Sequence, residues 1–241
     1  MKIAIIGYGK MGKTIERLAT NKGDEIVLKI TSQNTNELTI DNLQKADVAI
    51  EFTRPEMAFD NIKLCLEAGI PVVSGTTAWM DQYDEAATLC TKHKGGLFVA
   101  SNFSIGVNVF FAANAYVAKL MNQYDGYRVD MEEVHHTQKL DAPSGTAITL
   151  ANKITNNLDR MNGWHLKGDG ADHPKNSIPI TAKRIDKVPG THVVRYESGI
   201  DELSFSHVAH GREGFASGAI MAARWMIGKE GCFGMTDLLG I

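Results

Sequence analysis

The N-terminal part of the chain alternates between short apolar runs and longer segments whose apolar residues share one helical face. The short runs predict buried strands, and the longer segments predict amphipathic helices. Strands that alternate with helices indicate a parallel sheet with crossover helices. We expect strands over residues 2–6, 25–31, 46–53, 71–74 and 96–100, and helices over 10–21, 55–68 and 80–93.

The pattern changes after Asn102, which predicts a domain boundary at residues 102–104. The runs that follow alternate between apolar and polar residues and are separated by turns, which favours a mixed or antiparallel sheet. Residues 158–176 are rich in Gly, Asp, Asn and His and are expected to form a long mobile loop. This region and the chain end are predicted to contain helices over 108–121, 147–158 and 216–227, and strands over 127–136, 182–186, 192–198 and 202–208.

Composition narrows the class of protein. The 241 residues are 44% hydrophobic and 22% charged, which is typical of a soluble globular protein. A formal net charge of -3 argues against nucleic acid as a partner. The longest apolar run, residues 107–120, is too short to span a bilayer. The cysteines are few, odd in number and far apart, so we expect reduced thiols in a cytoplasmic protein: Cys65, Cys90 and Cys232.

The first turn carries a glycine motif. A strand and a helix flank the sequence Gly7-Tyr8-Gly9-Lys10-Met11-Gly12, which fits the dinucleotide-binding pattern G-x-G-x-x-G. Gly7 permits the tight turn, Gly9 lets the backbone approach a pyrophosphate, and Gly12 lets the helix pack on the strand. The alternative is a glycine turn in an α/β protein without a cofactor.

Coenzyme specificity depends on the end of the second strand. No acidic residue follows Ile30, so nothing there would grip a free ribose 2′-hydroxyl as an NAD-specific acid does. A 2′-phosphate could meet Ser32, with charge from Lys10 or Arg17, although both basic residues are also typical of a solvated helix. We therefore expect NADPH or NADH, with a mild preference for NADPH.

Two further turns follow apolar strands of the predicted parallel sheet. Ligands bind at the edge formed by the carboxyl ends of such strands. Both turns are therefore candidates for the nicotinamide side, although ordinary turn chemistry would also explain them: Gly75-Thr76-Thr77 and Ala100-Ser101-Asn102-Phe103.

The segment with the most candidate catalytic and binding residues follows a predicted strand. This strand ends in His135 and His136, and a helix begins soon after. Helix N-terminal amides and the hydroxyls of Ser144 and Thr146 would form a carboxylate cradle. Lys139 adds a positive charge, and a nearby histidine can donate a proton at neutral pH. Taken singly, the hydroxyls could be routine helix caps and the histidines a strand end. A zinc site is not expected, because adjacent strand residues point to opposite faces.

These segments resemble the dihydrodipicolinate reductase (4-hydroxy-tetrahydrodipicolinate reductase) family. The resemblance is carried by the run from His135 to Ala147, and it extends in order to four other stretches: 75–77, 102–108, 190–192 and 206–219. The residues between the second and third strands, 33–45, are fewer than in longer family members. Gln138 stands where those members often carry a basic residue.

The resemblance implies a fold, an activity and a set of site residues. A Rossmann-like domain, residues 1–103 and 215–241, would bind NADPH or NADH, and an α+β domain with a mixed sheet, residues 104–214, would bind substrate and form a homotetramer. Hydride would pass from the nicotinamide to a cyclic dicarboxylate in diaminopimelate and lysine biosynthesis. Among site residues, His135 holds the acid/base position and Lys139 that of the proton donor. Substrate-binding positions are His136, Gly145 and Thr146, with Ser144 from the cradle argument.

Two other interpretations remain open from the sequence. Another small two-domain reductase, similar to homoserine or aspartate dehydrogenases, would explain the glycines but not the segment from Lys139 to Thr146. A non-catalytic NAD(P)-binding redox sensor would be expected to carry a DNA-binding module, and no winged-helix-like or basic segment is evident.

Overall fold

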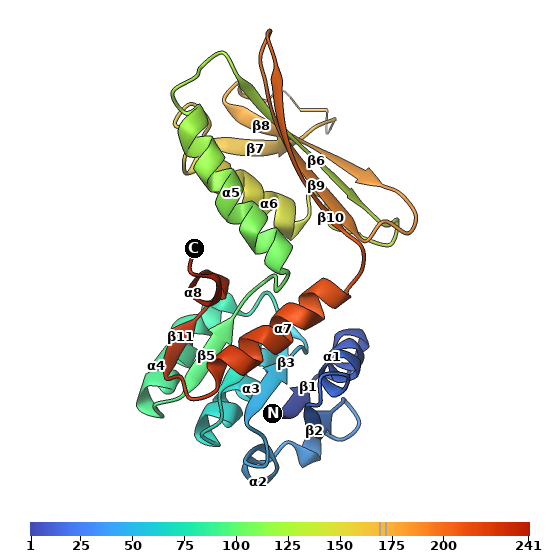
Figure 1. Cartoon of the computed structure of the whole chain (residues 1–241), viewed down its shortest axis with the longest axis vertical. Helices are drawn as coiled ribbons and strands as arrows, with labels where there is room; N and C mark the ends of the chain where they lie inside the picture. The colour runs from blue at the N-terminus through green and yellow to red at the C-terminus, as the bar shows by residue number, and fades with distance from the viewer. Residues whose placement is uncertain (169, 172) are drawn as a thin grey trace. The chain divides into compact units, whose positions relative to one another are not determined.

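The computed structural model describes residues 1–168, 170–171 and 173–241. The chain forms two compact units, one comprising Met1–Ile105 with Arg212–Ile241 and the other comprising Gly106–Gly211 (Figure 1). Each unit has its own sheet and its own hydrophobic core. None of the helices in the described part of the chain has the length and apolar character needed to span a membrane.

The first unit is built on a parallel sheet in which each strand lies beside its neighbour in the order β11-β5-β4-β3-β1-β2. Five of these strands were predicted, and they follow the apolar runs closely because parallel strands are buried on both faces. The strands are β1 (Lys2–Ile6), β2 (Glu25–Ile30), β3 (Val48–Glu51), β4 (Val72–Ser74), β5 (Gly96–Val99) and β11 (Gly231–Phe233).

Helices cover both faces of this sheet. One core lies between the sheet and α3 with its neighbours, and the other lies between the sheet and α1, α7 and α8. Helix α7 therefore belongs to the first unit and packs on β3 and β4. The helices are α1 (Lys10–Thr20), α2 (Ile40–Leu43), α3 (Pro55–Glu67), α4 (Tyr83–Lys92), α7 (Glu213–Met226) and α8 (Met235–Leu239), with 3₁₀ turns η1 (Thr35–Glu37) and η2 (Met80–Gln82).

The second unit is a mixed sheet with two helices, as predicted. The strand order is β10-β9-β6-β8-β7. Strand β9 is antiparallel to β10 and β6, and β8 is parallel to β6 and β7. The core of this unit lies between one face of the sheet and the two helices (Figure 1). The elements are α5 (Ile105–Met121), β6 (Arg128–His135), α6 (Gly145–Thr155), β7 (Gly163–Leu166), β8 (Ser177–Arg184), β9 (Gly190–Glu197) and β10 (Glu202–Ala209).

Two predictions for this unit were wrong. The segment 158–176, expected to be a loop throughout, contains the edge strand β7, whose four residues are too few to show an alternating pattern. Residues 169 and 172 of that segment lie outside the described residues. Strand β8 begins at Ser177 and not at 182. The prediction missed its first residues because Pro179, a residue that normally argues against a strand, lies within it.

Strand register brings distant residues together at one end of β6. Glu133 lies directly opposite His192 of β9, and His135 lies opposite Arg184 of β8. Residues two apart on a strand point to the same face. The charged and titratable side chains of three strands therefore meet at this end of the sheet.

Candidate active site

The glycine turn after β1 has no room for side chains at two of its three glycines. Gly7 has a φ of +97°, and a Cβ atom there would lie 1.9 Å from the carbonyl oxygen of Phe52. A Cβ atom on Gly12 would lie 2.6 Å from the carbonyl oxygen of Gly7. At Gly9, the N-cap of α1, a Cβ atom would have no atom of the described residues within 4 Å, and none of their side chains caps the helix. Its free amides therefore face open space, as a phosphate site requires.

A cavity of about 340 Å³ opens beside this turn. Gly7, Tyr8 and Gly9 line one part of it, and Ser32 lines another. The walls also include Arg54, the residue before α3, whose guanidinium forms no ion pair with any described residue. Sequence reasoning missed Arg54, because it follows the third strand and not the second, where the ribose ligand usually lies.

The basic residues of α1 do not line this cavity. Arg17 instead pairs with Glu213 of α7, with 2.5 Å between Nη2 and Oε1. Lys10 is exposed at the first position of the helix, and Met11 is half-buried beside it. Among the described residues, Arg54 is therefore the one arginine that lines the cavity containing Ser32.

A buried carboxylate links the turns after β3 and β4. Glu51 has no exposed surface, and its Oε1 accepts hydrogen bonds from the Thr53 amide (2.9 Å) and the Thr76 hydroxyl (2.7 Å). Its Oε2 accepts a hydrogen bond from the Ser74 hydroxyl over 2.6 Å. Gly75 lies against the ring of Phe52, where a Cβ atom would come within 2.1 Å of ring carbon. These contacts fix the backbone of both turns.

The third turn, after β5, places its four residues differently. Ala100 and Asn102 are half-buried, Ser101 is exposed, and Thr77 of the neighbouring turn is also exposed. Phe103 is 2% exposed and packs in the core beside α7, where its carbonyl oxygen lies against Gly218.

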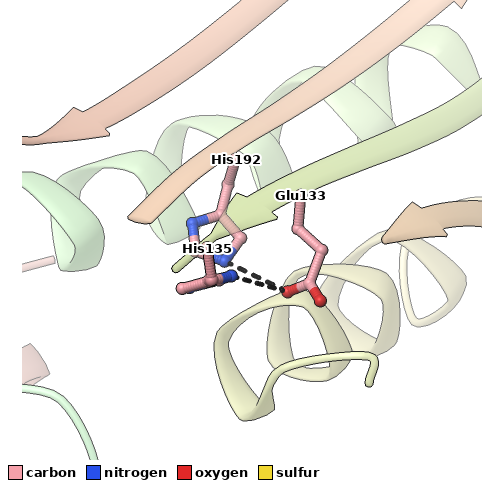
Figure 2. A group of neighbouring side chains, drawn as sticks. All are labelled: Glu133, His135 and His192. Carbon is pink, nitrogen blue, oxygen red and sulfur yellow. Dashed lines mark ion pairs between the residues drawn. The ribbon is translucent and has the colours of Figure 1, made fainter. Parts of the chain in front are cut away.

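In the second unit, three titratable side chains converge at the end of β6 (Figure 2). The His135 Nδ1 atom lies 3.4 Å from Glu133 Oε2, and the His192 Nε2 atom lies 3.8 Å from the same oxygen. The two imidazole rings meet edge to face, with centroids 5.1 Å apart. Glu133 has no exposed surface, and both histidines are buried.

Burial controls the protonation of both histidines. It lowers the pKa of His192 to about 3, so this ring is neutral near pH 7. Burial also lowers the pKa of His135, while the Glu133 carboxylate raises it and the charges of Lys139 and Arg184 lower it. His135 is therefore mostly neutral at neutral pH, within a set of charged neighbours.

The N-terminus of α6 lies beside these histidines. The Ser144 hydroxyl caps the helix by accepting the Ala147 amide over 3.2 Å, and it also lies 3.1 Å from His192 Nε2. Ser144 is 2% exposed, so its hydroxyl is used within the protein. Gly145, by contrast, is exposed, and a Cβ atom there would meet no atom within 4 Å in the described part of the chain. Thr146 is half-buried in the same turn.

Lys139 and Arg184 provide the positive charge. The Lys139 ammonium donates to both carboxylate oxygens of Asp141 at 2.8 Å, which lowers the pKa of Asp141. Arg184 donates from Nη2 to Glu133 Oε1 over 3.1 Å and to the Asp141 carbonyl over 2.6 Å. Half-buried His136 accepts the Lys139 amide through its carbonyl over 3.1 Å.

Sequence reasoning identified His135, Lys139 and the α6 cap, and the second unit brings these together. It did not single out four residues of the same cluster. Two lie far along the chain and reach the site only through strand register, and two lie inside the motif without an assigned role: Glu133, Asp141, Arg184 and His192.

Glu133, His135 and His192 also offer three potential metal-ligand atoms within 4.8 Å of one another. Their existing partners argue for a hydrogen-bond network instead. Ser144 donates its amide to Glu133 Oε2, and its hydroxyl meets His192 Nε2. Two of the three ligand atoms are therefore already engaged.

Comparison with known proteins agrees with this geometry. Residues 1–103 match the family model described as "Dihydrodipicolinate reductase, N-terminus", and residues 106–239 match "Dihydrodipicolinate reductase, C-terminus". The chain is 48% identical over 239 residues to a 4-hydroxy-tetrahydrodipicolinate reductase of Christiangramia forsetii, covering 99% of this chain and 98% of the relative. It is 30% identical over 266 residues to the enzyme of that name from Neisseria gonorrhoeae, covering 100% and 98%.

A solved structure gives the same fold. The dipicolinate-bound dihydrodipicolinate reductase of Paenisporosarcina sp. TG-14 aligns with a TM-score of 0.76 at 24% identity and covers 98% of both chains. The family models together span nearly the whole chain, and the relatives align with both units. The chain therefore belongs to the dihydrodipicolinate reductase family.

Proposed function

We propose that this protein is a 4-hydroxy-tetrahydrodipicolinate reductase, an NAD(P)H-dependent oxidoreductase of diaminopimelate and lysine biosynthesis. Family membership over the full chain supports the activity. The single observation that carries the mechanism is the cluster at the end of β6, where His135 and Lys139 lie near the N-terminus of α6.

The first unit fits a dinucleotide. The space left at Gly9 and the uncapped amides of α1 suit a pyrophosphate, and the cavity beside Ser32 suits the adenosine end. Gly75, Thr76 and Thr77, with the backbone of residues 100–103, are assigned to the nicotinamide end. When bound there, the coenzyme supplies the hydride of the reduction.

The second unit is assigned to substrate binding. A cyclic dicarboxylate carries two negative charges, and one carboxylate is assigned to the first turn of α6 at Gly145 and Thr146. His136 and the Lys139 ammonium complete this anion site. Ser144 contributes through its cap, which fixes the first turn of α6.

The same unit supplies the proton. Lys139 is assigned as proton donor and His135 as the acid/base group, as the family resemblance implies. Burial keeps His135 neutral near pH 7, so the charged Lys139 is the group that carries a proton to give. His135 can then relay a proton from solvent and return the site to its starting state.

We further propose a cytoplasmic homotetramer assembled through the second unit. One face of the mixed sheet is covered by α5 and α6. On the opposite face, Asp130, Glu132, Thr191 and Val193 remain partly exposed in the single chain. Light scattering should give a particle of four chains, and a monomer would contradict this assembly.

The activity is tested by following absorbance at the nicotinamide band with substrate generated enzymatically in the cuvette. The protein should oxidise NADPH or NADH only when the substrate-generating enzyme and its own substrates are present. Coenzyme binding without substrate-dependent oxidation would contradict the reductase and favour a non-catalytic NAD(P)-binding protein.

A further inference from the structure

Glu133 is a fully buried carboxylate at the centre of the candidate active site. Burying a charge is unfavourable unless partners compensate for the lost water. Here Arg184 donates to Oε1 over 3.1 Å and the Ser144 amide donates to Oε2 over 3.0 Å. Because apolar residues would usually stabilise such a position as well, the carboxylate calls for a role beyond stability.

The first link runs from this carboxylate to His135. The His135 Nδ1 atom is buried, forms no hydrogen bond with any described residue, and faces Glu133 Oε2 at 3.4 Å (Figure 2). A carboxylate facing one ring nitrogen favours the tautomer with hydrogen on that nitrogen. The lone pair of the neutral ring is then on Nε2, which lies beside Gly190, where a Cβ atom would come within 3.1 Å.

The second link runs from Glu133 to the segment that carries Lys139. Arg184, held by Glu133, donates from Nε to the Lys139 carbonyl over 3.2 Å and from Nη2 to the Asp141 carbonyl over 2.6 Å. The third link is the Ser144 amide, one residue before α6. One carboxylate therefore contacts or reaches all three parts of the site.

We propose that Glu133 is a positioning residue for the reduction: it fixes the His135 tautomer with Nδ1–H toward its own carboxylate, and through Arg184 and the Ser144 amide it holds the Lys139 segment and the α6 N-terminus in register. This inference rests on the proposed function for its effect on turnover. Its effect on the His135 tautomer is independent of turnover.

The test compares Glu133→Gln with a control, Glu67→Gln. Glu67 is an exposed glutamate at the end of α3 in the first unit, away from this cluster. Glu133→Gln should lower kcat about 10- to 100-fold, with the dissociation constant for NADPH changed less than about twofold. Glu67→Gln should leave both values near those of the wild type.

A second readout is the ¹⁵N NMR titration of His135. Four other charged or titratable groups face this ring, and none of them is substituted in the variant: Lys139, Asp141, Arg184 and His192. Removing the Glu133 charge should lower the pKa of His135 further and shift the neutral ring away from the Nδ1–H tautomer. The inference would be overturned if His135 kept its tautomer and pKa in Glu133→Gln, or if this variant kept the kcat of the wild type.

Glu133→Asp covers the case in which the Gln variant fails to fold. The shorter side chain keeps the charge but draws back from Arg184 and Ser144, so kcat should fall while His135 stays closer to its wild-type pKa. A wild type without substrate-dependent oxidation would contradict the proposed function alone, because the NMR titration still decides the tautomer.

Discussion

The carboxylate of Glu51 accepts a hydrogen bond from the Thr76 hydroxyl over 2.7 Å and so connects the ends of two neighbouring parallel strands. The same Oε1 atom accepts the Thr53 amide. Thr53 lines the cavity of the first unit, and Thr76 lies in the turn assigned to the nicotinamide. A single buried side chain therefore shapes two parts of the proposed coenzyme site.

Glu51→Gln should weaken coenzyme binding. An amide nitrogen cannot accept a hydrogen bond, so at least one of the present donors would lose its acceptor, at a typical loss of about 1–3 kcal/mol. We expect the dissociation constant for NADPH, measured by calorimetry, to rise about tenfold or more. The exposed Glu67→Gln is the matched control. Equal affinity in both variants would show that Glu51 does not shape the coenzyme site.

Coenzyme preference depends on the cavity wall formed by Ser32 and Arg54. Ser32→Asp should shift the ratio of kcat/KM values toward NADH, because a carboxylate repels a 2′-phosphate and accepts from a free 2′-hydroxyl. Arg54→Gln should lower kcat/KM for NADPH more than for NADH, by about one to two decades. If neither variant moves the ratio, the 2′ position lies elsewhere.

Acid should destabilise the second unit through His192. Its pKa is lowered from 6.5 to about 3 by burial, so below pH 6.5 the unfolded chain binds a proton that the folded chain does not. The contribution of neutral His192 to the free energy of unfolding is complete above pH 6.5. It is lost as pH falls toward 3, by up to about 1.4 kcal/mol per pH unit. Urea unfolding of His192→Gln should show a shallower acid slope than that of exposed His210→Gln. Parallel slopes would contradict the burial of a neutral imidazole.

The sequence predicted the sheet of the first unit well because buried parallel strands are continuous apolar runs, as in the stretch that ends at Glu51. Site residues that lie close together in one sequence motif, such as His135 and Lys139, could also be predicted. Arg184 and His192 were not, because their place in the site depends on which strands pair and in which register. Strand β11 was missed because its three residues, Gly231–Phe233, carry no periodic pattern and are placed by pairing with β5.

We infer that the second unit of this chain provides the acid chemistry for a reductase whose coenzyme binds the first unit. The most direct test measures NADPH oxidation with enzymatically generated substrate in wild type, His135→Ala and Lys139→Ala, together with the dissociation constant for NADPH. We predict substrate-dependent turnover in the wild type, kcat lowered about 10²- to 10⁴-fold in each variant, and coenzyme affinity changed little. Near-wild-type turnover in both variants would contradict the account.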